Sequence, residues 1–227
     1  MEKVIVFDFD GTLTQKGANV WKTLWEMAGY PTGEGSTYRN LFRDYINGEY
    51  SYQKWCDLTC EYFRKGNLNS IKVSTTGAIL PRIKGIKNTL EVLKSKGYDL
   101  FIVSGSIKQI IKSYLKENIN YFTGIYANNF NYDNNGIIES ITATPFDFDG
   151  KKVFIEHLIN SGIKKENIIF IGNSYNDEKV SSAGVKTICI NPETKNFNDK
   201  SIWHKAIISE SLSKILPEII NENENIK

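Results

Sequence analysis

The chain has 227 residues and a formal net charge of +2, with 41% hydrophobic and 24% charged residues. These proportions are ordinary for a globular protein, and so small a charge gives no basis for attraction to nucleic acid or to a membrane surface. The longest apolar runs have the length of a strand, and the charged pair Glu2-Lys3 followed at once by a strand is unlike a signal peptide. We therefore expect a cytoplasmic protein that has neither nucleic-acid nor membrane partners.

The chain contains three cysteines, Cys56, Cys60 and Cys189. An odd number in a chain of this size gives no disulfide framework, and no histidine lies near them at the spacings that zinc sites use. We predict that all three are buried and reduced.

Residues 4–7 read Val-Ile-Val-Phe and predict a short buried strand, which Asp8 and Asp10 follow directly. Side chains two positions apart on an extended segment point the same way, so both carboxylates can face one crevice, while Gly11 lets the chain turn away. Open α/β sheets bind ligands at this end of their strands. The pattern favours phosphoryl transfer with Asp8 as nucleophile, Asp10 exchanging protons, and a Mg²⁺ ion offsetting the negative charge.

Residues 18–64 have the apolar spacing of three amphipathic helices, and residues 68–71 predict a short fourth. Because this segment comes directly after the first strand, we interpret residues 15–76 as a small helical cap. Most of its aromatic residues are expected to form the core of the bundle, with a few lining the pocket below.

From Pro81 onward, strands alternate with helices, which is typical of a doubly wound α/β fold with a mostly parallel sheet. Residues 1–14 and 77–227 are expected to form this core. The predicted helices are 85–96, 107–117, 151–160, 177–183 and 212–220. The predicted strands are 99–103, 125–127, 168–171, 186–190 and 206–208, with a surface hairpin formed by 129–132 and 137–142. The polar tail 221–227 is expected to fray.

Three later loops also follow strands or begin helices. Ser104 and Gly105 follow the strand 99–103 and can bind phosphate oxygens. Lys151 offers a cation for the transferring oxygens, with Lys152 as the competing candidate. The loop 172–177, Gly-Asn-Ser-Tyr-Asn-Asp, supplies the oxygen ligands that Mg²⁺ prefers.

Residues 146–150 repeat residues 7–11 letter for letter, as Phe-Asp-Phe-Asp-Gly. Pro145 precedes the second copy, and since proline cannot donate to a β-ladder, no strand is expected there. We interpret the second copy as a loop that delivers Lys151 and caps its helix, rather than as a second catalytic carboxylate pair formed by Asp147 and Asp149.

The chain resembles the haloacid dehalogenase superfamily of phosphatases, and within it the phosphoserine phosphatase-like branch. The matching motifs are Asp8 to Thr12, Val103 to Ser106, Lys151, and Gly172-Asn173 with Asn176-Asp177. The resemblance implies that Asp8 is phosphorylated and binds Mg²⁺. It also implies that Asp10 binds Mg²⁺ through its backbone carbonyl, protonates the leaving oxygen and then activates the hydrolytic water.

Two positions depart from the family pattern. Asn173 stands where the family has a metal-binding aspartate, and a neutral ligand should hold Mg²⁺ less strongly; Asp177 is the candidate that compensates, directly or through water. The cap glutamate and arginine that hold the amino acid in phosphoserine enzymes correspond to Gly17 and Thr59. Arg39, Arg43 and Arg64 could serve another anionic substrate, although a solvated helix face is the preferred interpretation.

The sequence therefore predicts a Mg²⁺-dependent hydrolase of small phosphate monoesters. The predicted metal ligands are Asp8, Asp10, Asn173 and Asp177, and the predicted substrate contacts are Ser104, Gly105, Lys151 and Asn176. The alternatives are a phosphotransferase or mutase of the same fold and a non-catalytic Mg²⁺-binding homologue. Dehalogenase chemistry has no use for Mg²⁺, so Asp10 and the loop 172–177 argue against it.

Overall fold

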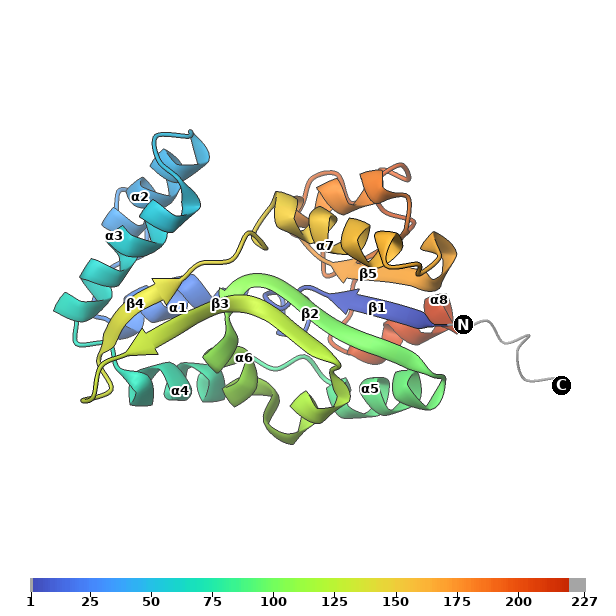
Figure 1. The fold of residues 1–227 in the computed structure, drawn as a ribbon, viewed down its shortest axis with the longest axis horizontal. Helices are drawn as coiled ribbons and strands as arrows, with labels where there is room; N and C mark the ends of the chain where they lie inside the picture. The colour runs from blue at the N-terminus through green and yellow to red at the C-terminus, as the bar shows by residue number, and fades with distance from the viewer. Residues whose placement is uncertain (1, 221–227) are drawn as a thin grey trace, which may run out of the picture.

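A seven-stranded sheet runs through the computed structural model, which describes residues 2–220 (Figure 1). The strand order is β4-β3-β2-β1-β5-β6-β7, and every neighbouring pair is parallel except β3 and β4. The strands are β1 (Lys3–Phe7), β2 (Tyr98–Ile107), β3 (Gly124–Tyr132), β4 (Ile138–Thr142), β5 (Ile168–Gly172), β6 (Lys186–Ile190) and β7 (Lys205–Ile207). The predicted α/β fold with a mostly parallel sheet is confirmed.

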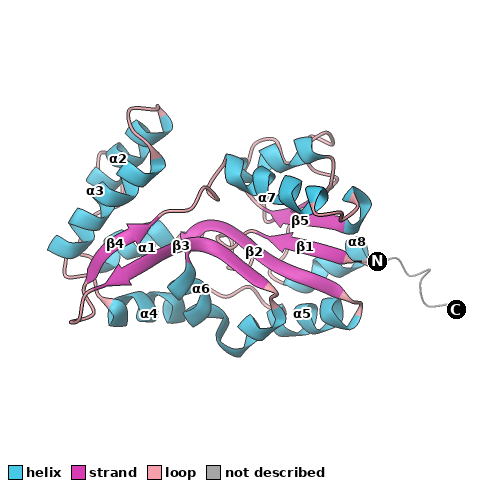
Figure 2. Cartoon of the chain, in the orientation of Figure 1, coloured by secondary structure: helices cyan, strands magenta, loops and turns pink. Residues whose placement is uncertain are grey.

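Helices connect the strands and cover both faces of the sheet (Figure 2). The α-helices are α1 (Val20–Met27), α2 (Thr37–Ile46), α3 (Tyr52–Lys65), α4 (Ser70–Ile79), α5 (Ile86–Ser95), α6 (Lys108–Leu115), α7 (Asp149–Asn160) and α8 (Leu216–Ile219). The 3₁₀ segments are η1 (Lys116–Tyr121), η2 (Lys165–Asn167), η3 (Tyr175–Ala183) and η4 (Leu212–Ile215).

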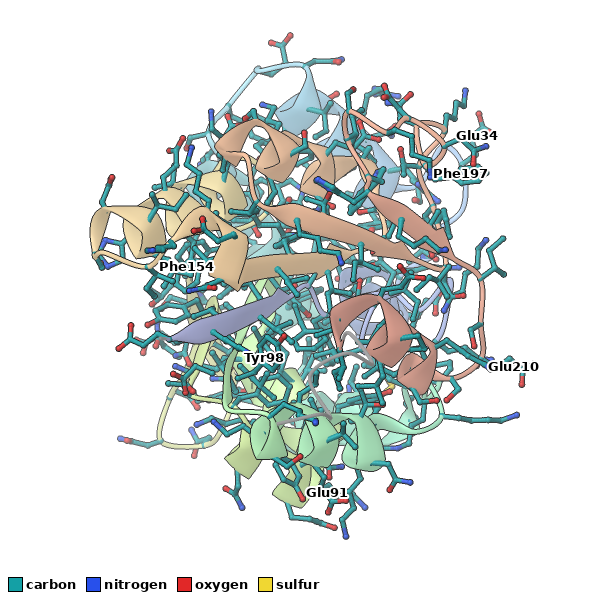
Figure 3. All side chains as sticks on the ribbon, turned by 90° about the vertical axis from the view of Figure 1, so that its right-hand side faces the viewer. Glu34, Glu91, Tyr98, Phe154, Phe197 and Glu210 are labelled. Carbon is teal, nitrogen blue, oxygen red and sulfur yellow. The ribbon has the colours of Figure 1, made fainter. Side chains whose placement is uncertain are left out.

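The central strand β1 is buried on both faces because alternate side chains enter two different hydrophobic clusters. Ile5 and Phe7 belong to the cluster that includes α5, α6 and the first helices, whereas Val4 and Val6 pack with α7. Figure 3 shows the two sides from the end of the sheet, with Phe154 of α7 on one side and Glu91 on the outer face of α5 on the other. A strand covered on both faces reads as a continuous apolar run, which is why β1 is evident from the sequence.

Helices α1 to α4 lie between β1 and α5 in the chain. α3 packs against the edge strand β4 with α2 beside it, while α4 lies with α5 and α6 along one side of the sheet (Figure 1). The predicted helix at 68–71 is instead the ten-residue α4, whose Gly77 approaches the backbone of Ile110 in α6. α4 crosses the boundary expected at residue 76, so the division into a cap and a core stays a prediction.

Four other predicted elements differ from the structure. β2 continues through Ser104 and Gly105 to Ile107, with a register shift after Val103. β3 has nine residues and passes directly into the predicted hairpin with β4. The helix expected at 177–183 is the 3₁₀ segment η3, and the one expected at 212–220 is divided into η4 and α8; the tail 221–227 lies outside the described residues.

Cys56, Cys60 and Cys189 are buried and form no disulfide, as predicted. Across residues 2–220, none of the helices combines the length and the apolar character needed to cross a membrane.

Candidate active site

A pocket of about 430 Å³ lies at the ends of β1 and β5, beside Ser104 to Ser106 of β2, where the first helices approach the sheet. Six of the predicted site residues line it: Asp8, Asp10, Ser104, Gly105, Asn173 and Asn176. The parallel pairing of β1 with both β2 and β5 brings the ends of β1 and β5 beside the part of β2 that follows its register shift. The remaining two predicted residues, Lys151 and Asp177, lie beside the pocket in contact with Asp8 or with each other.

Lys151 is the centre of a buried charge network. Its Nζ lies 3.1 Å from Oδ1 of Asp8 and 2.6 Å from Oδ1 of Asp177, and the exposed fraction of each side chain is 5% or less. The competing candidate Lys152 lies at the surface, where its Nζ is 3.5 Å from Glu156. Lys151 is therefore the lysine that contacts the carboxylate expected to react.

Asp177 holds Lys151 and also fixes the loop after β5. Its second oxygen, Oδ2, accepts hydrogen bonds from the backbone N–H groups of Asn173 and Ser174, at 2.9 and 3.1 Å. The hydroxyl of Ser174 completes a capping box at the start of η3. Both carboxylate oxygens of Asp177 thus accept hydrogen bonds from groups of the protein. This arrangement suits a residue that positions Lys151 and the loop better than a direct metal ligand.

Asp8 and Asp10 form a pair of poorly solvated carboxyl groups. Burial raises the pKa of Asp8 to about 6, with Lys151 opposing the rise and Asp177 adding to it. Burial, and next the charge of Asp8, raise the pKa of Asp10 to about 8. Oδ1 of Asp10 accepts a hydrogen bond from the backbone N–H of Val20, at 3.0 Å. A carboxyl group with a pKa near neutrality is suited to give and take a proton.

Asn173 packs directly against the turn that follows Asp10. Gly11 has φ +72°, and a Cβ on it would lie 2.1 Å from Nδ2 of Asn173. Oδ1 of Asn173 lies 3.4 Å from the hydroxyl of Thr12, so it has only a long hydrogen bond. Within the described part of the chain, no three His, Cys, Asp or Glu residues gather in a group that could hold a metal, so a metal here would need amide or backbone oxygens as well.

The Ser104–Gly105 segment is held by three side chains from different elements. The carbonyl of Gly105 accepts hydrogen bonds from Nε1 of Trp21 in α1 (2.9 Å), Nδ2 of Asn128 in β3 (2.6 Å) and the hydroxyl of Tyr52 in α3 (3.4 Å). Asn128 is fully buried and was not identified from the sequence. An asparagine within an otherwise strand-like segment is the signal that points to it, because a buried amide needs partners.

The two copies of Phe-Asp-Phe-Asp-Gly have different structures. Residues 146–148 of the second copy lie in the turn before α7, and Asp149 and Gly150 are the first two residues of that helix. The segment delivers Lys151 as predicted. Asp147 lines the pocket, whereas Asp149 is exposed and pairs with Lys179, so the two do not form a carboxylate pair. The predicted capping function is wrong, because Phe148 occupies the N-cap position of α7 and makes no side-chain cap.

Aromatic rings from the first helices cover the pocket opposite the sheet. Trp21, Phe42 and Trp55 line it, together with Arg39 and Gly17 near its mouth. Trp21 and Trp55 contact each other edge to face, with ring centroids 4.6 Å apart. Arg43 and Arg64 are exposed, in agreement with a solvated helix face, and Thr59 is buried.

Comparison with known proteins agrees with this architecture. The family model of haloacid dehalogenase-like hydrolases matches residues 2–181. A phosphoserine phosphatase in a phospho-aspartyl intermediate analogue form has a TM-score of 0.74 at 20% identity, covering 96% of this chain and 99% of that one. A substrate-bound phosphoserine phosphatase has a TM-score of 0.75 at 19% identity, with 97% and 99% coverage.

A hydrolase of the same family from Salmonella enterica serovar Typhi has a TM-score of 0.75 at 18% identity, covering 96% of this chain and 71% of that one. The TM-scores of these three structures show a shared fold. No curated protein matches the sequence.

Proposed function

Because the chain belongs to the haloacid dehalogenase-like hydrolases, we propose that it is a Mg²⁺-dependent phosphatase that cleaves the phosphate monoester of a small metabolite. The observation that carries this proposal is the buried contact of Lys151 with Asp8, at the end of the central strand and on the floor of a pocket. A cation beside a carboxylate nucleophile can stabilise the negative charge that collects on the transferring phosphoryl group. The similarity of the fold to phosphoserine phosphatases supports the same reaction class.

Asp8 acts as the nucleophile. One of its carboxylate oxygens bonds to phosphorus while the bond from phosphorus to the leaving oxygen breaks, which gives an aspartyl-phosphate. Asp10, whose pKa is raised to about 8, donates a proton to the leaving oxygen. The carboxylate of Asp10 then accepts a proton from water as that water attacks phosphorus and releases phosphate from Asp8.

Ser104, Gly105 and Asn176 border the same pocket and are suited to bind the phosphate oxygens. The three hydrogen bonds to the Gly105 carbonyl fix this segment before substrate arrives. Asp177 keeps Lys151 in place against Asp8, so the positive charge needs no rearrangement during the reaction.

The donor set at this edge of the sheet fits Mg²⁺. Asp8 supplies a carboxylate, Asn173 an amide oxygen with only one long hydrogen bond, and Asp10 its backbone carbonyl, all of them the hard oxygen ligands that Mg²⁺ prefers. Burial is the main cause that raises the pKa values of Asp8 and Asp10, and a cation bound beside them would favour their charged forms. When bound, Mg²⁺ would neutralise charge on the phosphate oxygens.

Replacing Asp8 tests the proposal. We expect Asp8→Asn to remain folded by circular dichroism and to lose phosphate release from a panel of sugar, amino-alcohol and nucleotide phosphates by about 1,000-fold or more, because the nucleophile is gone. Asp149→Asn, which changes the exposed aspartate of the second copy, is the matched control and should keep full activity. A folded Asp8→Asn variant that still releases phosphate would contradict the mechanism.

A further inference from the structure

Asp147 is a pocket carboxylate that the reaction above does not use. Its Oδ1 accepts a hydrogen bond from Nδ2 of Asn176, at 3.3 Å, and lies so close to Gly105 that a Cβ there would be 2.5 Å away. Among the described residues, Asp147 forms no ion pair; Lys151, the cation nearest in sequence, is already paired with Asp8 and Asp177. No cation among the described residues therefore contacts this carboxylate directly, although the charge of Lys151 opposes the rise in the Asp147 pKa that burial causes.

The surroundings of Asp147 are aromatic. The phenol groups of Tyr38 and Tyr45 have pKa values raised to about 12, mainly by burial, and the negative charge of Asp147 contributes to both shifts. The same charge also raises the pKa values of Tyr52 and Tyr175, again after burial as the main cause. These rings come from α2, α3 and η3, so they approach the carboxylate from the first helices as well as from the sheet side.

Phe148 adds a further ring to this group, which links the two sides of the pocket. Its ring centroid lies 6.3 Å from that of Tyr45 and 5.6 Å from that of Tyr175. Phe148 and Tyr175 both line the pocket beside Asp147. The carboxylate thus lies next to a partly apolar wall where a ligand can be shielded from water.

The loop that carries Asp147 is fixed on both sides. Oδ1 of Asn128 accepts hydrogen bonds from the backbone N–H and the hydroxyl of Thr144, at 2.7 and 3.1 Å. The backbone N–H of Gly150 donates to the carbonyl of Pro145 (3.1 Å), and Phe146 packs edge to face on Phe154. Asn128 also binds Gly105, so one buried side chain holds both the Asp147 loop and the Ser104–Gly105 segment.

A desolvated carboxylate beside aromatic rings favours one class of ligand. The carboxylate attracts a positive charge, and the faces of the rings attract the same charge through their quadrupoles. Lys22 and Arg39 also border the pocket, but both side chains are exposed. We propose that Asp147 and the rings of Tyr38, Phe148 and Tyr175 that line the pocket bind a protonated amine in the leaving group, so that the substrate is the phosphate monoester of an amino alcohol.

This inference rests on the proposed phosphatase function, and a matched pair of substrates tests it. 2-Aminoethyl phosphate carries an ammonium group, and 2-hydroxyethyl phosphate is its neutral counterpart. With Mg²⁺ present, we expect the wild-type protein to prefer the amine by about 10- to 100-fold in kcat/KM, the range for a hydrogen bond to a charged group. Asp147→Asn can still accept the Asn176 hydrogen bond. This variant should lose the preference for the amine, and its kcat/KM for the neutral ester should differ from that of the wild type by less than about 3-fold.

Asp149→Asn is the control for Asp147→Asn, because it makes the same chemical change two residues along the chain, at the exposed first residue of α7. It should keep the preference for the amine. The inference would be overturned if Asp147→Asn lowered kcat/KM equally for both substrates, or if the wild-type protein did not favour the amine. Either result would leave the phosphatase proposal intact.

A binding measurement separates the inference from the proposed function. Calorimetric titration of the Asp8→Asn protein measures binding without turnover. We expect 2-aminoethyl phosphate to bind more tightly than 2-hydroxyethyl phosphate. This difference in affinity should be lost in the Asp8→Asn/Asp147→Asn double variant. Binding of the amine without hydrolysis by the wild-type protein would support the amine site and contradict the phosphatase. Equal binding of the two esters would overturn the amine site.

Discussion

Asp10 is held by the fold in an environment that disfavours its charge. Burial and the neighbouring Asp8 raise its pKa from 3.8 to about 8, so the folded protein keeps this proton over a pH range in which the unfolded chain releases it. The contribution of this proton to stability is complete below about pH 4 and is lost as the pH rises through 8. The Asp10 carboxyl group, which is suited to proton transfer, therefore lowers the stability of the folded protein at pH values where it is charged.

Asp10→Asn should remove this cost. In EDTA, we expect the melting temperature of the variant to exceed that of the wild type by about 3 °C or more at pH 8, since 1 kcal/mol corresponds to roughly 2–4 °C for a chain of this size. The difference should shrink at pH 5, where Asp10 holds its proton and resembles the neutral amide. Thermal unfolding at the two pH values measures it, and a difference that does not change with pH would contradict the assigned environment.

Individual residues were predictable from the sequence where chain order determined their position. Asp8 and Asp10 follow a strand, and Lys151 lies in the first turn of a helix, so their convergence follows from the topology of a parallel sheet. The orientation of Asp147 toward the pocket depends on the path of an irregular loop, which is held by contacts between Thr144 and the distant Asn128. No local pattern encodes such contacts, and the repeated letters at 146–150 gave no means of separating Asp147 from Asp149.

At the scale of elements, strands buried on both faces and amphipathic helices were predicted well. β1, β5 and β6 have continuous apolar runs, and their positions agree with the prediction within one residue. α4 was largely missed because its sequence, Ser-Ile-Lys-Val-Ser-Thr-Thr-Gly-Ala-Ile, has weak amphipathic spacing, and its packing against α6 supplies the stabilisation. β3 was predicted too short because the polar residues Asn128, Asn129 and Asn131 interrupt the apolar pattern.

The start of α7 offers a test at this scale, because the helix carries Lys151 in its first turn. A Cβ on Gly150 would lie 2.0 Å from the carbonyl oxygen of Pro145, so a side chain there must displace the start of the helix. We expect Gly150→Ala to lower the free energy of unfolding by about 1–3 kcal/mol and to reduce kcat. Gly33→Ala is the control, since nothing lies within 4 Å of the added carbon, and it should change stability by less than about 0.5 kcal/mol. Urea unfolding of both variants makes the comparison, and equal stability would show that the turn accommodates a side chain.

At the scale of the whole molecule, one hydrophobic cluster extends from the inserted helices to the sheet. Trp25 and Phe63 belong to the same cluster as Ile5 and Leu100. Contacts that are shared in this way couple the unfolding of the parts that share them. The helical segment 15–76 should therefore unfold together with the sheet, even though it begins and ends as an insertion.

Tryptophan fluorescence can measure this coupling, because Trp21, Trp25 and Trp55 lie in the inserted helices and Trp203 precedes β7. In a Trp203→Phe variant all remaining tryptophan emission comes from the insertion. We expect its urea midpoint to coincide with the midpoint from circular dichroism, which reports all the helices. A fluorescence transition at lower urea would show that the insertion unfolds separately.

The two ends of the insertion meet at one place in the structure. The backbone N–H of Gln15 donates to the carbonyl of Pro81, at 3.0 Å, and Thr14 pairs with Arg82 in an antiparallel bridge. In evolutionary terms, a segment with adjacent ends can be exchanged or lengthened by recombination without rerouting the sheet. Four aromatic residues that line the pocket, Trp21, Tyr38, Phe42 and Trp55, belong to this segment, whereas Asp147, Phe148 and Tyr175 lie outside it. Replacing a single stretch of gene can therefore reshape one wall of the pocket around the leaving group, while the reacting residues and Asp147 pass on unchanged.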